Sequence, residues 1–155
     1  MRKIFYLLVI VAGVTLLATP VSQLSVDKKI WIRIDSLESV GLFRSALELT
    51  EKIYFQAKEK ADPETEIKAL IYRLKYIQEL EEDGQLAAIA ALEKELPDER
   101  LVQGSLKYSM LAELYYRYYS ANRWQINQNP MEDKGYSQPL KNWSPERFYH
   151  IILDH

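Results

Sequence analysis

The sequence predicts an all-α protein in which antiparallel helical hairpins stack as an irregular bundle similar to tetratricopeptide repeats. Three observations support this fold class. Apolar residues recur with helical spacing from Val26 to Trp124. Only five glycines and six prolines interrupt runs rich in Ala, Leu, Glu and Lys. The connections are short, so consecutive helices should be antiparallel. We expect about five to six helices, with one hairpin domain at 26–124, a loop at 125–143 and the truncated start of a further helix at 144–155.

Residues 1–25 have the pattern of a signal peptide. Two basic residues precede an apolar run from Ile4 to Ala18. That run of about 15 residues is shorter than the roughly 20 needed to cross a bilayer. The alternative is an uncleaved amino-terminal anchor, which would be the only membrane contact. Either interpretation places the remaining chain outside the cytoplasm, so the predicted location is periplasmic, cell-envelope or secreted.

The segment 26–40 is ambiguous at its start, where isoleucines alternate as in a strand, but Trp31 and Ile34 also belong to a helical stripe. Gly41 stands where a helix would end, and 42–61 is strongly periodic, which favours a helix, a turn and a second helix. The residues predicted to face inward on the second helix are Leu47, Ile53, Tyr54, Ala57 and Ala61.

Asp62 and Pro63 mark the start of a third helix, since aspartate caps free N–H groups and proline suits the first helical position. This helix should run to about Glu82, and a fourth should span 85–96. Asp98 then opens the fifth. The predicted apolar stripes consist of Ile67, Leu70, Ile71, Leu74 and Ile77 on the third helix, and Leu86, Ile89, Ala90 and Leu96 on the fourth.

The residues from Gly41 to Leu47 resemble the turn and second-helix start of a tetratricopeptide repeat, in which a glycine lets two helices approach closely. A weaker copy begins at Gly84. The two glycines are 43 residues apart rather than the roughly 34 of that repeat. A stack of irregular helix pairs therefore fits better than a true repeat array.

The fifth helix carries a tyrosine-rich surface. At 3.6 residues per turn its broad apolar face consists of Tyr108, Leu111, Ala112, Tyr115, Tyr116 and Tyr119. Tyr118 should be more exposed. Two interpretations remain open, packing in the core and docking of a partner, because tyrosine is common at interfaces. The candidate docking residues are Tyr108, Tyr115, Tyr116, Tyr118, Tyr119 and Trp124. Trp124 and Trp143 are also expected to hold the two ends of the loop onto the bundle.

The chain shows little that is typical of catalysis. It has no cysteine, no glycine-rich phosphate loop and no glycine-flanked serine. His150 and Asp154 are four residues apart but are expected to form an ordinary solvent-facing pair rather than a metal site. The acidic run 79–83 is interpreted as a solvated helix end. The net charge of −2 offers nothing that attracts nucleic acid. We therefore expect a non-enzymatic protein without cofactor or metal.

Four blocks in order resemble one family, the helical amino-terminal region of alpha-2-macroglobulin-like proteins of Bacteroidetes-type bacteria. The blocks are Asp35–Lys60, Lys68–Tyr76, Leu80–Gly84 and Ser109–Trp124. The resemblance implies a part of a protease-trapping protein, an endopeptidase inhibitor. It transfers no functional residue, because this chain has no cysteine for a thioester and no recognisable bait region.

Two functions are therefore expected. The first is an exported helical module that packs or docks against the other domains of a longer alpha-2-macroglobulin-like protein. The alternative is a stand-alone periplasmic adaptor of tetratricopeptide type, which binds a partner protein through the tyrosine-rich helix.

Overall fold

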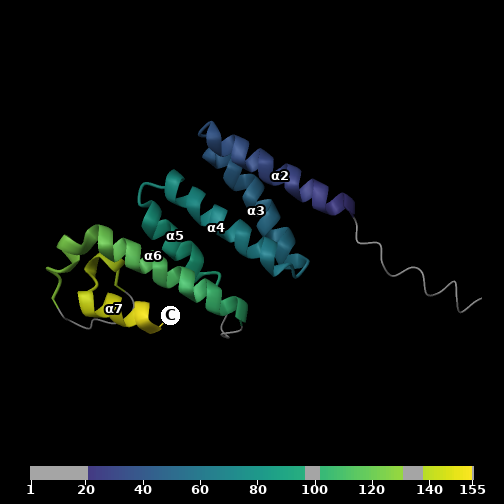
Figure 1. Ribbon diagram of the computed structural model, residues 1–155. Coiled ribbons are helices and arrows are strands. Elements are labelled where there is room, and N and C mark those ends of the chain that lie inside the picture. Colours follow the sequence, from purple (N-terminus) through teal and green to yellow (C-terminus); the bar gives the residue numbers. More distant parts are fainter. Residues whose placement is uncertain (1–20, 97–101, 131–137, 155) are drawn as a thin grey trace, which may run out of the picture.

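The protein is an all-α stack of helices in the computed structural model, which describes residues 21–96, 102–130 and 138–154 (Figure 1). These ranges contain no strand. The helices are α2 (Val21–Ser39), α3 (Phe43–Glu59), α4 (Pro63–Leu80), α5 (Gly84–Glu93), α6 (Val102–Ile126), the short 3₁₀ helix η1 (Leu140–Asn142) and α7 (Pro145–Asp154). The predicted fold class is confirmed, and the segment 26–40, whose start is ambiguous in the sequence, is helical through Ser39.

Several predicted boundaries shift or fall outside the described residues. Helix α2 already begins at Val21, inside the range assigned to the leader. Helix α6 continues to Ile126, and η1 lies in the segment predicted as loop. The apolar run of the leader, the predicted helix start at Asp98 and the middle of the loop are not among the described residues.

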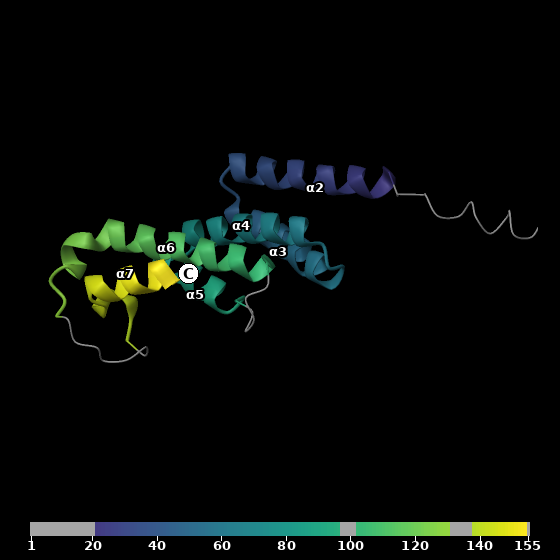
Figure 2. The same cartoon turned by 60° about the horizontal axis from the view of Figure 1, so that its bottom comes forward.

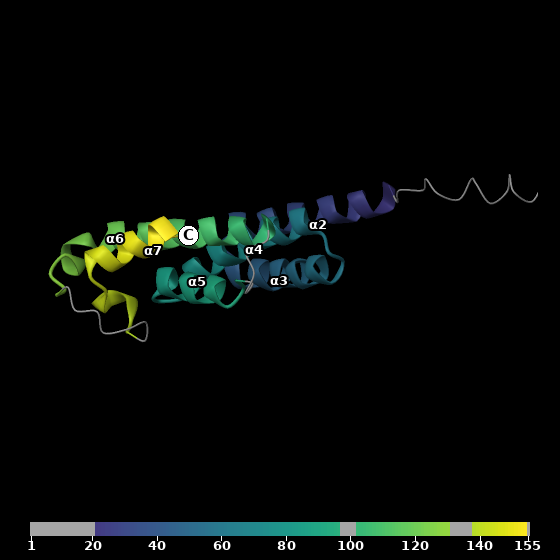
Figure 3. The same ribbon diagram turned by 90° about the horizontal axis from the view of Figure 1, so that it is seen from below.

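The helices form two layers. Figure 3 shows α2, α4 and α6 side by side in one layer, with α3 and α5 in the other. Figure 2 shows α2 and the α6–α7 pair at opposite ends of the stack. Hydrogen bonds between side chains join alternate helices at sequence separations of 37 to 41 residues, as between Tyr54 and Glu95 or Lys107 and Glu66. The stack thus repeats about every 40 residues.

The start of α4 forms as its sequence predicts. The Asp62 carboxylate accepts a hydrogen bond from the backbone N–H of Thr65 at 3.2 Å, and Pro63 occupies the first turn. Glu64 and Glu66 lie at the positive end of the helix dipole. Hydrogen bonds from Thr65 lower the pKa of Asp62, because they stabilise the charged carboxylate.

The two glycines of the repeat-like motifs act in different ways. Gly41 has a φ of +76° and open space around its Cα, so it serves the turn through its backbone conformation. Gly84 is buried, and a Cβ there would lie 2.1 Å from the carbonyl oxygen of Gln78. Only Gly84 therefore provides the close approach of two helices that the motif predicts.

The core contains many of the residues predicted to face inward, including Ile53, Tyr54, Leu70, Leu74 and Ile89. Three predicted core residues are exposed instead, which corrects the stripes. They are Ala61, Ile71 and Ala90. Ala61 lies in the α3–α4 turn with a φ of +52°, Ala90 is on the outer face of α5, and Ile71 is 51% exposed beside a groove described below.

Glu95 joins three helices. Its carboxylate accepts hydrogen bonds from the Tyr54 hydroxyl at 2.7 Å, Lys58 Nζ at 3.0 Å and Arg73 Nη1 at 3.2 Å. Burial by itself raises the pKa of Glu95, but the hydrogen bonds from Tyr54 and Lys58 and the nearby positive charges bring it below its usual value of 4.5. The carboxylate is therefore part of the contact between the layers.

Replacing the carboxylate by an amide, Glu95→Gln, should lower the free energy of unfolding at pH 7 by about 1.5 kcal/mol, because hydrogen bonds to a charged acceptor are lost. The folded-state pKa of Glu95 lies below the unfolded value, so this stabilisation is complete above about pH 4.5 and is lost as the pH falls through the folded-state pKa. Urea unfolding at pH 7, 5 and 3.5 should show the difference between wild type and Glu95→Gln shrinking with acidity. Glu48→Gln, at an exposed position of α3, is the control.

Candidate functional site

The tyrosine-rich helix α6 divides its candidate docking residues between core and surface. Tyr115, Tyr118 and Tyr119 are buried, whereas Tyr116 is 55% and Trp124 is 81% exposed. Tyr108 is half-buried. The expectation that Tyr118 is the more exposed ring and that Tyr116 lies with Tyr119 is therefore wrong.

The inward face of α6 is centred between Leu111, Tyr115 and Tyr118 rather than on the predicted line. The reason is the position of α7, which covers this side of α6 near its carboxyl end (Figure 2). The Phe148 ring of α7 lies 6.1 Å from that of Tyr118 and 5.5 Å from that of Tyr119, measured between ring centroids. Periodicity within α6 could not reveal which neighbour would turn Tyr118 inward.

The two tryptophans expected to hold the loop behave differently. Trp143 is buried, donates its indole N–H to the Gln138 carbonyl oxygen at 3.0 Å and lies 5.7 Å from the Tyr115 ring. The Asn129 amide, three residues after the end of α6, donates to the carbonyl oxygens of Lys141 and Trp143 and so joins the two ends of the loop. Trp124 makes no such attachment because its side chain is exposed, so that half of the expectation is wrong.

Burial changes the chemistry of the inward tyrosines. Burial and a hydrogen bond to the Glu93 carboxylate raise the pKa of Tyr115 far above its ordinary value. Burial also raises the pKa of Tyr118. Both hydroxyls stay protonated in the folded protein, and that of Tyr115 helps to hold α6 against α5 through Glu93. They are not available to a partner.

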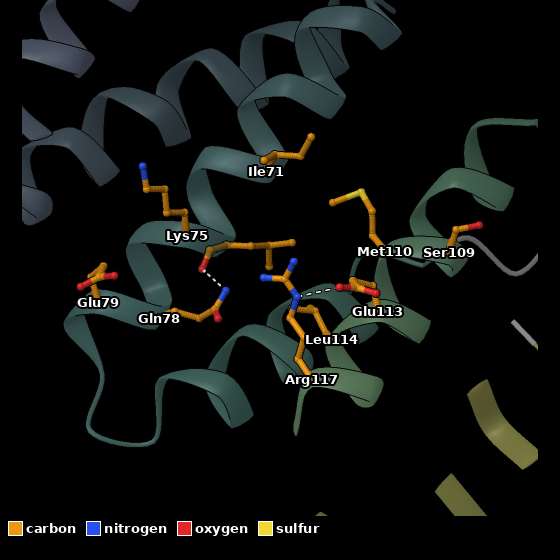
Figure 4. Close-up of a pocket in the computed structure, with 10 residues that line it drawn as sticks. Ile71, Lys75, Gln78, Glu79, Ser109, Met110, Glu113, Leu114 and Arg117 are labelled. Atoms are coloured by element: carbon orange, nitrogen blue, oxygen red, sulfur yellow. Dashed lines mark hydrogen bonds and ion pairs between the residues drawn. The ribbon is translucent and has the colours of Figure 1, made fainter. Parts of the chain in front are cut away.

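A groove lies between α4 and α6 (Figure 4). Its volume is about 500 Å³. The apolar residues that line it are Ile71, Leu74, Met110 and Leu114, and the polar ones are Lys75, Gln78, Glu79, Ser109, Glu113 and Arg117. Apolar walls with a charged rim are typical of sites that bind an apolar side chain of a partner.

The charges at the rim are partly neutralised within the chain. Arg117 Nε lies 2.7 Å from the Glu113 carboxylate, one turn away on α6. Lys75 donates to the Glu38 carboxylate of α2, and this contact together with the Tyr76 hydrogen bond lowers the pKa of Glu38. Both rim cations therefore already have a carboxylate partner.

The groove was not predicted from the sequence. The predicted apolar stripe of α4 places Ile71 and Leu74 in the core, and none of the α6 residues that line the groove belongs to the predicted apolar face of that helix. Parallel alignment of α4 with α6 brings these two faces together, and that alignment depends on the intervening α5. The two walls of the groove are about 40 residues apart in the sequence, and no local pattern predicts that they become neighbours. Only the tertiary structure therefore reveals the site.

No group of three or more metal-ligating side chains occurs within the described ranges. His150 Nδ1 lies 2.8 Å from the Asp154 carboxylate, and both side chains are largely exposed, as expected for a solvent-facing pair. Among the described helices, none is long and apolar enough to span a membrane.

Comparison of the chain with protein-family profiles, with curated proteins and with solved structures finds no match. The resemblance to the alpha-2-macroglobulin family therefore stays a prediction.

Proposed function

We propose that this chain is a non-enzymatic protein-docking module and that the groove between α4 and α6 is its docking site. The observation that carries the proposal is an open space of about 500 Å³ with an apolar floor, lying between two parallel helices of one layer. Stacked helical hairpins present extended surfaces of this kind to partner proteins.

Exposed side chains near the groove support the proposal. Ile71 is 51% exposed on the α4 side, although removing an isoleucine side chain from water is energetically favourable. Trp124 does not line the groove, but it lies seven residues after Arg117, on the same face of α6 and about 10 Å further along the helix. Large exposed aromatic and aliphatic side chains beside a groove are the residues that contribute most to binding when a partner covers them.

The sequence resemblance suggests where such a partner is found. In the alpha-2-macroglobulin interpretation the groove docks other domains of the same exported protein. In the adaptor interpretation it docks a separate periplasmic protein. A coding sequence that continues in frame from His155 into macroglobulin domains would favour the first interpretation.

The docking function can be tested by selecting phage-displayed random 16-residue peptides on the immobilised full chain. We expect binders whose affinity falls at least tenfold with Ile71→Glu, because the substitution places a charge in the apolar floor of the groove. Binding of the synthetic peptides would be measured by fluorescence anisotropy.

Ile32→Glu is a matched control, since Ile32 on α2 is 55% exposed and does not line the groove. It should bind the peptides as the wild type does. Both variants change exposed residues, and circular dichroism would verify that they keep the helical fold. Selection without any binder sensitive to Ile71→Glu would refute the docking function.

A further inference from the structure

Helices α2, α4 and α6 are successive neighbours in one layer, and we call the α2–α4 contact the first step and the α4–α6 contact the second. The first step shows how side chains fill the space between two such helices. Between α2 and α4, the Trp31 and Tyr72 rings lie 5.1 Å apart. Lys68 Nζ lies 4.1 Å from the Trp31 ring centroid, and the Tyr76 hydroxyl donates to Glu38 at 2.8 Å. Aromatic rings therefore occupy this space.

The second step, between α4 and α6, has no such rings. The separation of 41 residues that pairs Glu66 with Lys107 relates the two steps. Applied to the α4 residues Lys68, Tyr72 and Tyr76, it leads to Ser109, Glu113 and Arg117, all of which line the groove. The same separation takes Trp31 to Tyr72, whose ring packs against Trp31 in the first step, so the α4 wall of the groove carries Ile71 and no ring. Smaller or charged side chains stand where aromatic rings fill the first step, which explains the open volume.

The charges of the groove are asymmetric along its length. Glu79 lines the groove near the end of α4, and Glu81, Glu82 and Asp83 follow it, all exposed. None of these four carboxylates forms an ion pair with a basic side chain of the described residues. Because Lys75 and Arg117 are already paired, the net field at this end of the groove is negative and favours a positively charged group.

We infer that the occupant of the groove is a segment of a partner protein that carries one large aromatic side chain and, towards the Glu79 end, a lysine or arginine. This inference rests on the proposed docking function and specifies its partner. The ring occupies the space between Ile71 and Met110, much as the rings of Trp31 and Tyr72 fill the first step, and the cation lies against Glu79. Ile71 and Glu79 are about 12 Å apart along α4 at 1.5 Å per residue. The two partner residues are therefore separated by about two turns of a helix or about four extended residues.

The test uses the selected peptides that are sensitive to Ile71→Glu. We expect this pool to be enriched in peptides with an aromatic and a basic residue at the stated spacing. For the tightest peptide, replacing the aromatic residue by alanine should weaken binding at least tenfold. Replacing the basic residue by glutamate should weaken binding to the wild type and strengthen binding to Glu79→Lys, so that the charge preference is inverted.

A second variant tests the equivalence of the two steps through the stability of the protein as well as through peptide binding. Glu113→Tyr combined with Arg117→Tyr should fill the groove with rings, raise the melting temperature by several degrees and abolish peptide binding. Glu48→Tyr, at an exposed position of α3, should change neither quantity. An unchanged melting temperature with retained binding would overturn the equivalence.

The two proposals fail in different ways. Peptides that bind the wild type but not Ile71→Glu, yet show no preference for an aromatic or basic residue, would overturn the assigned partner chemistry and leave the docking function in place. The absence of any peptide sensitive to Ile71→Glu would overturn the docking function itself.

Discussion

The substitution Gly84→Ala should lower the free energy of unfolding by about 3 kcal/mol. The added Cβ would lie 2.1 Å from the carbonyl oxygen of Gln78 and 2.8 Å from its carbonyl carbon and Cα. These are backbone atoms of the last turns of α4, so no side chain can rotate to make room. Helix α5 would have to move away from α4, and overpacking of this kind typically costs 1 to 3 kcal/mol and occasionally more.

Thermal and urea unfolding, followed by circular dichroism at 222 nm, would measure the change. Gly41→Ala is the matched control, because a Cβ at Gly41 meets nothing within 4 Å. Its cost comes only from the positive φ and should be about 1 kcal/mol. A loss for Gly84→Ala no greater than that for Gly41→Ala would show that the α4–α5 contact adjusts easily and is not tightly packed at Gly84.

The contrast between these glycines shows what the sequence can predict about this fold. Helix starts such as Asp62–Pro63 depend on local chemistry, so they are predictable and are confirmed. The motif at Gly41 suggested close packing of two helices, but the contact that forbids a side chain occurs at Gly84. Both positions look alike in the sequence because glycine serves a positive φ and a close approach equally well.

The candidate site was harder to predict because it depends on which helices become neighbours. Within α6 the apolar pattern is consistent with several faces, and the packing of Phe148 selects the one that contains Tyr118. Ile71 belongs to a regular apolar stripe of α4, yet it lines the groove because no large side chain of α6 covers it. The spacing of apolar residues predicts which face of a helix is buried on average, but it does not predict where two neighbouring helices leave a gap.

Phe148→Ala should release α7 from the stack. Phe148 is fully buried, with its ring 5.3 Å from that of Trp143 and close to those of Tyr118 and Tyr119. Truncation of a buried phenylalanine typically costs 3 to 5 kcal/mol. Helix α7 has only 10 residues and is too short to be stable without its tertiary contacts. We therefore expect α7 and the attached Trp143 to detach while α2 to α5 keep their structure.

Hydrogen exchange would measure this effect, with protection lost in 138–154 and retained in α3 and α4. Leu153→Ala is the control on the same helix, because Leu153 is 84% exposed, and it should change stability by less than about 0.5 kcal/mol. The detached state would expose Tyr118 and Tyr119 on the end of the stack, and their contact with α7 shows that this end can bind an amphipathic helix. If Phe148→Ala instead lowered protection equally in every helix, α7 would belong to a single cooperative unit with α2 to α6, and its contacts would contribute to the stability of the whole stack.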